Sequence, residues 1–147
     1  MRATAATNRV TQAERSHAVQ YAGSAVNPVI PVGGVEAWRL EAIKKVCALG
    51  NLDNNWDGHN SGAPSRGVRN CAVDLLLSVP GVNWPTPRVV PVSGGGLHFE
   101  WSLGRRELEL YIEPDCSIEL LRVENGMPIE AEPPEDVSSF FEWLSAR

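Results

Sequence analysis

The hydrophobic pattern changes its period near residue 87, and this change restricts the possible folds more than any other feature of the chain. Before it, apolar residues recur at helical spacing along one stripe, made of Val68, Cys71, Ala72, Leu75, Leu76 and Val79. After Pro87, apolar and polar residues alternate, as they do along strands that bury one face. The chain therefore predicts helical structure first and an antiparallel sheet afterwards.

Three helices are predicted around this sheet. The first runs from about Val35 to Leu49 and ends at Gly50, a residue typical of helix C-termini. The second starts near Pro64 or Ser65, with the proline as a favourable first helical residue, and stops at Pro80-Gly81. The third follows the break at 133–134 and has an apolar stripe of Val137, Phe140, Phe141 and Leu144.

The alternating region predicts a meander of four to five strands. Prolines favour edge positions for 88–92 and for the segment that begins at 127, because proline cannot donate to a ladder. Pairing Ile112 with Ile118 keeps apolar residues opposite one another and leaves a three-residue turn, 114–116. Such turns usually end in a left-handed glycine, and Cys116 occupies that place.

These elements predict one α+β domain over residues 34–147. It consists of two N-terminal helices, the antiparallel meander and a C-terminal helix, and the helices cover the apolar sheet face. Residues 1–33 show no period and are interpreted as an extended N-terminal arm.

The composition of the chain indicates its cellular environment and the classes of partner it can bind. The net charge of −5 argues against nucleic-acid binding, which requires clustered cations. The three cysteines Cys47, Cys71 and Cys116 form no C-x-x-C pair, and we expect them to be reduced in a cytoplasmic protein. The start of the chain lacks the apolar run of a secretory signal, and no apolar stretch is long enough for a membrane span.

The stretch "NLDNNWDGHNSGAP", residues 51–64, allows a metal-binding and a structural interpretation. Asp53, Asn55, Asp57 and Gly58 match the first half of a calcium loop, but its twelfth position is Pro64, which has no side-chain oxygen. Asparagine and aspartate also form local turns with their own backbone. We therefore expect a turn rather than a metal site; a surface site in which Trp56, Asp57 or His59 faces a partner is the other alternative.

The polar face of the predicted sheet carries seven candidate residues: His98, Glu100, Glu107, Glu109, Tyr111, Glu113 and Glu119. Paired carboxylates can perform acid–base chemistry, but a solvated face balanced by Arg105, Arg106 and Arg122 is the favoured interpretation. The histidines and cysteines lack zinc spacing, and no nucleophile elbow, phosphate loop or dinucleotide motif occurs. No catalytic residue, metal or cofactor is predicted.

Residues 36–123 resemble a widespread, functionally uncharacterised set of small bacterial proteins. The resemblance rests on "NNWDGHNSGAP" before a helix, then "GGGLHFEW", then "LELYIEPDCSIELL". The shared pattern is N-W-D-G, A-P, G-G-x-x-x-E-W and P-D-G, and Cys116 replaces its last glycine. The resemblance implies a bacterial cytoplasmic origin and no particular activity.

Two functions are compatible with these observations. The favoured one is a non-enzymatic protein-binding module, a small acidic bacterial or mobile-element protein that docks on a larger partner and inhibits or regulates it. The alternative is a small-ligand-binding protein or hydrolase-like enzyme that uses the Glu-rich sheet face. The candidate partner-binding residues are Trp56, Asp57, His59, His98, Glu100, Glu107, Glu109, Tyr111 and Glu119.

Overall fold

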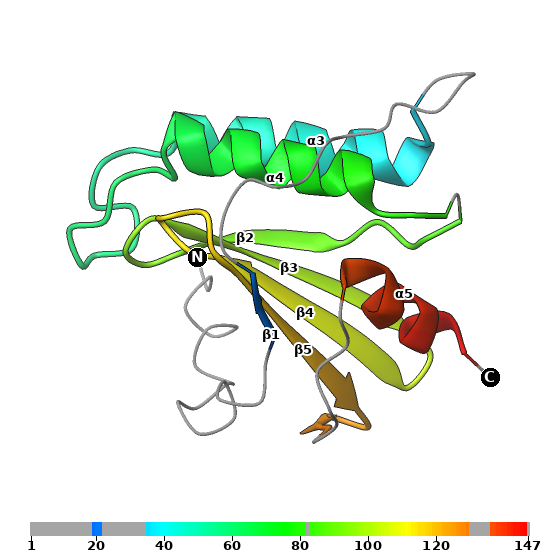
Figure 1. Cartoon of the computed structure of the whole chain (residues 1–147). Coiled ribbons are helices and arrows are strands. Elements are labelled where there is room, and N and C mark those ends of the chain that lie inside the picture. The colour runs from blue at the N-terminus through cyan, green and yellow to red at the C-terminus, as the bar shows by residue number, and fades with distance from the viewer. Residues whose placement is uncertain (1–18, 22–34, 82, 130–135, 147) are drawn as a thin grey trace.

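The computed structural model of the chain describes residues 19–21, 35–81, 83–129 and 136–146 (Figure 1). Its helices are α3 (Ala37–Ala48), the 3-10 turn η1 (Leu49–Asn51), α4 (Arg66–Ser78) and α5 (Val137–Ser145). Its strands are β1 (Val19–Tyr21), β2 (Arg88–Val92), β3 (Gly96–Leu103), β4 (Arg106–Ile112), β5 (Ile118–Glu124) and β6 (Met127–Pro128). The predicted α+β class is confirmed.

All strands belong to one antiparallel sheet with the order β1-β5-β4-β3-β2, and β6 pairs with β5. Ile112 pairs with Ile118 and Leu110 with Leu120, so the predicted register is confirmed. β1 comes from the segment 1–33, which therefore contributes a strand to the sheet. The division into an arm and a domain at residue 34 stays a prediction, and the predicted break at 133–134 lies outside the described residues.

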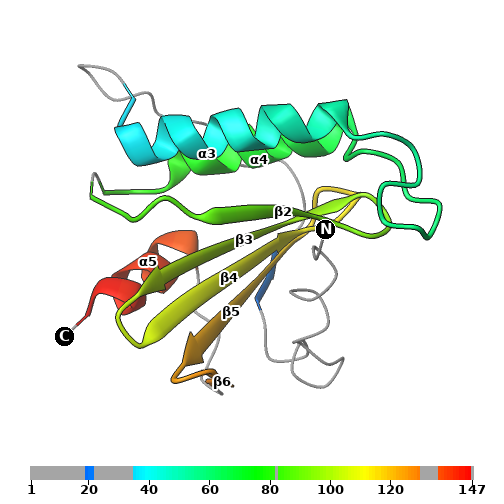
Figure 2. The ribbon, with the colours of Figure 1, turned by 180° about the vertical axis from the view of Figure 1, so that it is seen from behind.

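The helices lie on one side of the sheet, as expected from its apolar face. Figures 1 and 2 show α3 and α4 side by side over the β2 side of the sheet, with α5 farther along the same face. Trp101 of β3 contacts two of the helices: its ring centroid is 6.5 Å from that of Trp38 in α3 and 5.0 Å from that of Phe141 in α5. All three side chains are buried, and burial of such large apolar rings is the main stabilising contribution here.

Side chains close the helix ends. The hydroxyl of Ser65 accepts a hydrogen bond from the N–H of Val68 at 3.1 Å and caps α4. Pro64 therefore precedes the cap, and the expectation that it is the first helical residue is wrong. The buried guanidinium of Arg39 donates to the carbonyl oxygens of Leu76 and Val79, which binds α3 to the C-terminal end of α4. The helical stripe gave no indication of this arginine clamp.

Candidate functional site

The loop that joins η1 to α4, residues 52–65, is folded on itself. Asn55, Gly58 and Asn60 have positive φ angles of 63°, 74° and 63°, conformations that asparagine and glycine tolerate best. The side-chain oxygen of Asn55 accepts the N–H of Asn60 at 2.8 Å, and the indole N–H of Trp56 donates to the carbonyl of Gly62 at 3.0 Å. The predicted local turns are confirmed, and they hold this loop in one shape.

Asp57 is the centre of these contacts. Its carboxylate accepts the backbone N–H of His59 at 2.9 Å and the hydroxyl of Ser93 at 2.6 Å. Hydrogen bonds from Ser61 and Ser93 hold the pKa of the Asp57 carboxyl well below its usual value, because they stabilise the ionised form. A carboxylate with so low a pKa is a weak proton acceptor at neutral pH. Asp57 is therefore suited to organising the loop and poorly suited to general-base catalysis.

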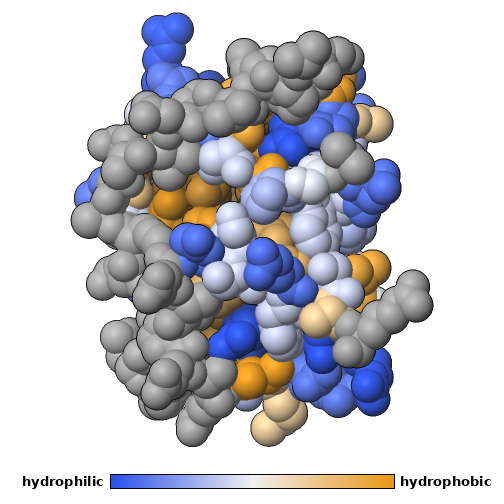
Figure 3. Space-filling view, turned by 45° about the vertical axis from the view of Figure 1, so that its right-hand side comes forward, coloured by the Kyte–Doolittle hydropathy of each residue, from blue (hydrophilic) through white to orange (hydrophobic). Residues whose placement is uncertain are grey.

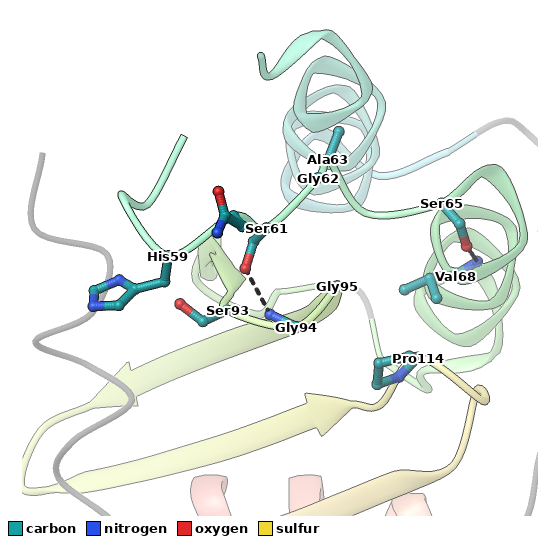
Figure 4. A pocket seen from close by; sticks show the side chains of 11 residues that line it. His59, Ser61, Gly62, Ala63, Ser65, Val68, Ser93, Gly94, Gly95 and Pro114 are labelled. Atoms are coloured by element: carbon teal, nitrogen blue, oxygen red, sulfur yellow. Dashed lines mark hydrogen bonds between the residues drawn. The ribbon is translucent and has the colours of Figure 1, made fainter. Parts of the chain in front are cut away.

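The loop also bonds to the turn between β2 and β3. The N–H of Gly94 donates to the hydroxyl oxygen of Ser61 at 3.0 Å, a bond drawn in Figure 4, and the Ser93–Asp57 bond lies beside it. Ser61 is buried at this junction, whereas His59 and Asn60 are exposed. Two segments more than 30 residues apart in the sequence thus form one rigid polar surface.

A pocket of about 700 Å³ lies between this loop, the start of α4 and the turn between β4 and β5. Figure 4 shows Val68 of α4 and Pro114 of the β4–β5 turn bordering the same space, with Gly94 and Gly95 of the β2–β3 turn to one side of them. The remaining lining is small or polar: His59, Asn60, Ser61, Gly62, Ala63, Ser65, Ser93 and Gly94. The pocket wall therefore carries few large apolar side chains.

The polar face of the sheet differs from the predicted solvated surface. His98, Glu109 and Tyr111 are 1%, 3% and 2% exposed, so the expectation that they are accessible is wrong. The ring of His98 stacks on that of Tyr111 with centroids 4.3 Å apart. The Tyr111 hydroxyl donates to Oε2 of Glu109 at 2.8 Å, and Nε2 of His98 lies 3.6 Å from the same oxygen. These residues form a buried polar cluster rather than an open acidic surface.

The other carboxylates of this face are half-buried: Glu100, Glu107, Glu113 and Glu119. Oε2 of Glu100 lies 3.7 Å from the guanidinium of Arg88 on the adjacent strand, and Glu107, Glu113 and Glu119 each have interaction partners. Arg106 and Arg122 do not balance this face as expected. Arg106 pairs with Glu124 at 3.1 Å and caps α5, and Arg122 lies over the rings of Phe140 and Trp143.

The cysteines depart from the prediction of three reduced thiols. Cys71 of α4 and Cys116 of the β4–β5 turn form a disulfide, while Cys47 is free and exposed. Cys116 does take the predicted left-handed conformation, with φ of 68°. The expectation of reduced cysteines is therefore wrong for this pair. It failed because the residue spacing does not reveal that the turn packs against α4.

The structure thus places the nine candidate residues in two sets. Trp56, Asp57 and His59 lie together in the loop, while His98, Glu100, Glu107, Glu109, Tyr111 and Glu119 lie on the sheet. The loop's partners Ser61 and Ser93, and the pocket wall at Val68 and Pro114, were not predicted. The run "SGGG" at 93–96 indicated a turn but not its contact with the loop.

Within the described residues, no group of three or more histidines, cysteines or acidic residues is placed to hold a metal ion. None of the described helices combines the length and apolarity needed to cross a bilayer. Comparisons with protein-family models, curated proteins and solved structures return no match to this chain. The site therefore has to be interpreted from its own geometry.

Proposed function

We propose that this chain is a non-enzymatic protein-binding module of the bacterial cytoplasm, and that it docks a polar segment of a larger partner protein at the loop and pocket described above. The observation that carries the proposal is the preorganised loop, in which Asp57 fixes the backbone while His59 and Asn60 remain exposed. A loop already held in one shape loses little conformational entropy when it binds. Binding residues are commonly displayed on such loops above a rigid scaffold.

The lining of the pocket favours a peptide over a small molecule. Small-molecule sites are usually lined by hydrophobic and aromatic side chains with few polar groups. Here the hydrophobic side chains are Ala63, Val68 and Pro114, and His59, an asparagine, three serines and three glycines supply the rest. Polar side chains such as His59, Asn60 and Ser65 suit a polar peptide segment, which offers amide and side-chain groups for hydrogen bonds.

The hydrophobic surface supports the same conclusion. Among the described residues, the exposed large hydrophobic side chains are Val35, Leu40, Leu103 and Met127, which come from different parts of the fold. On the face seen in Figure 3, hydrophobic residues form small groups among hydrophilic ones. A large apolar docking surface is thus not present on the described part of that face, and polar recognition at the loop is the better-supported mode.

The enzymatic alternative loses its main support. A substrate would have to contact the Glu-rich face, but His98, Glu109 and Tyr111 are buried against other groups. The candidate pocket is lined by other residues, and Asp57, whose carboxylate bonds to the lining residues Ser61 and Ser93, is a weak base. The binding interpretation therefore accounts for more of the geometry than hydrolysis does.

Site-specific photo-crosslinking tests the docking site. A photoreactive residue replaces His59 in one variant and the exposed Glu142 of α5 in a matched control. In lysate of the native host, the His59 variant should crosslink one protein that the Glu142 variant does not, and excess unmodified protein should compete it away. Equal crosslinking from both positions, or none from position 59, contradicts the proposal.

A further inference from the structure

The disulfide connects two walls of the candidate pocket, the helix α4 and the β4–β5 turn. Cys71 follows Val68 by three residues on α4, so both side chains lie on the same side of the helix. Cys116 follows Pro114 by two residues in the β4–β5 turn. Val68 and Pro114 both line the pocket, and the two cysteine Cα atoms are 6.2 Å apart. The covalent bond therefore sets how far these two walls can separate.

The backbone conformation of Cys116 indicates that its side chain contributes to the structure. Its φ of 68° lies in the left-handed region, where glycine is accommodated without strain and cysteine is not. The turn is held by the N–H of Cys116, which donates to the carbonyl of Glu113 at 2.8 Å. The disulfide to Cys71, which only a cysteine at this position can form, offsets this strain.

Contacts lead from this turn to the loop. Pro114 lies beside Gly95, because a Cβ placed on that glycine would be 3.9 Å from Cγ of Pro114. The neighbouring Gly94 donates its N–H to Ser61 of the loop at 3.0 Å. If the β4–β5 turn moves, it displaces the β2–β3 turn, which in turn bonds to the loop. Breaking the disulfide would therefore change the positions of all the segments that line the pocket.

We propose that the Cys71–Cys116 disulfide is a thiol-sensitive latch that holds the pocket in its binding form, and that its reduction loosens the pocket and weakens docking. The inference rests on the proposed function, since the pocket it controls is the proposed docking site. Both cysteines are half-buried rather than enclosed, so a reducing thiol has a route to the sulfurs. Disulfides in cytosolic proteins are usually transient and often redox-sensing, which agrees with the proposed location.

The reaction is ordinary thiol–disulfide exchange with a cellular dithiol protein as reductant. A thiolate of the dithiol attacks one sulfur of the pair, which forms a mixed disulfide and releases the other cysteine as a thiolate. The second thiol of the reductant then attacks the mixed disulfide. Two electrons and two protons pass to the chain, which gains two thiols, and the reductant leaves as its own disulfide. Reoxidation reverses these steps.

Hydrogen exchange measures the latch directly. All samples carry Cys47→Ser, which removes the free exposed thiol. Amide exchange is compared among the oxidised protein, the protein reduced by dithiothreitol, and a Cys71→Ala/Cys116→Ala variant. Reduction without denaturant should accelerate amide exchange at 93–95, 113 and 115–117 by about tenfold or more, and leave the central strand β4 protected. The double variant should exchange like the reduced protein whether or not dithiothreitol is present.

Binding of the crosslinked partner is the second readout. The oxidised protein should bind it about tenfold more tightly than the reduced protein, while the double variant shows the weaker affinity in both conditions. Equal exchange and equal affinity in both redox states overturn the latch and leave the binding function intact. A disulfide that dithiothreitol reduces only after unfolding also overturns it. Faster exchange of the pocket in a protein that binds nothing at position 59 supports the latch and contradicts the proposed function.

Discussion

The hydroxyl of Ser93 donates to the carboxylate of Asp57 at 2.6 Å and joins the loop before α4 to the turn between β2 and β3. Next to it, Gly94 donates to Ser61, so two neighbouring residues of the turn bond to the loop. These bonds organise an acidic, asparagine-rich loop. They explain how a loop of mainly polar residues takes up one defined conformation.

The first prediction concerns Asp57. Asp57→Asn should lower the melting temperature at pH 7, because the amide loses the charge that strengthens the bonds from Ser61 and Ser93. The folded-state pKa is depressed, so this contribution is present above the unfolded-state pKa of about 3.9 and is lost as pH falls below it. Melting curves between about pH 2 and pH 7 should therefore show the difference between the two proteins shrinking in acid.

Asp53→Asn is the matched control, because Asp53 is an exposed carboxyl of the same loop. Its melting temperature should follow that of the wild type across the pH range. An Asp57→Asn variant as stable as the wild type at pH 7 would show that the loop does not depend on the carboxylate.

The second prediction concerns the buried cluster on the sheet. Tyr111→Phe removes the 2.8 Å hydrogen bond to Glu109 and should lower the free energy of unfolding. A lost hydrogen bond to a buried charged group costs about 1–3 kcal/mol. Urea unfolding measures this, with Glu142→Gln on exposed α5 as a control expected to change stability by less than about 0.5 kcal/mol. Unchanged stability combined with lost partner binding would instead make Tyr111 a contact residue.

The third prediction separates the stabilisation by the disulfide from the backbone strain at Cys116. Under oxidising conditions, Cys71→Ala/Cys116→Ala should be less stable than the wild type by about 4 kcal/mol, the chain-entropy value for a bridge between residues 45 positions apart. Among proteins without the bridge, Cys116→Gly should be more stable than Cys116→Ala by about 1 kcal/mol, because φ is 68°. Urea unfolding gives both differences. Equal stability of the glycine and alanine variants would mean that the turn relaxes without the disulfide.

The fourth prediction concerns metal ions. Millimolar calcium or magnesium should leave the melting temperature unchanged, because the Asp57 carboxylate is already occupied by Ser93 and the His59 N–H. A site present at 100 times its dissociation constant would add about 2.7 kcal/mol of stability. A rise of several degrees that disappears in Asp57→Asn would establish a metal site in the loop.

The sequence predicted what depends on local patterning. The period of 3.6 located α4, and alternation gave the register of Ile112 with Ile118, because a slip of one residue would turn the apolar face outward. The left-handed turn at Cys116 also followed from the loop length alone. In each of these cases the interacting residues are close in the sequence, so the local residue pattern is sufficient to predict the structure.

What the sequence did not reveal depends on distant segments. The polarity of His98, Glu109 and Tyr111 suggested exposure, but a stacked ring pair and a shared carboxylate allow the three to be buried. The disulfide could not be inferred from three cysteines, because pairing Cys71 with Cys116 requires knowing that the β4–β5 turn meets α4. The pocket is likewise formed by four segments that no short motif connects.

The most direct test of the account measures how tightly the partner crosslinked at position 59 binds a variant with a large side chain added at the pocket wall. Gly62 lines the pocket, and a Cβ at this position meets only a side-chain oxygen of Asn54 at 3.8 Å, so Gly62→Leu should fold normally. Asn70→Leu adds the same side chain at an exposed position of α4 outside the pocket lining. Surface-plasmon titration should show Gly62→Leu binding at least about tenfold more weakly, a loss of about 1.4 kcal/mol, with Asn70→Leu unchanged. Wild-type affinity in a folded Gly62→Leu variant would contradict docking at this pocket.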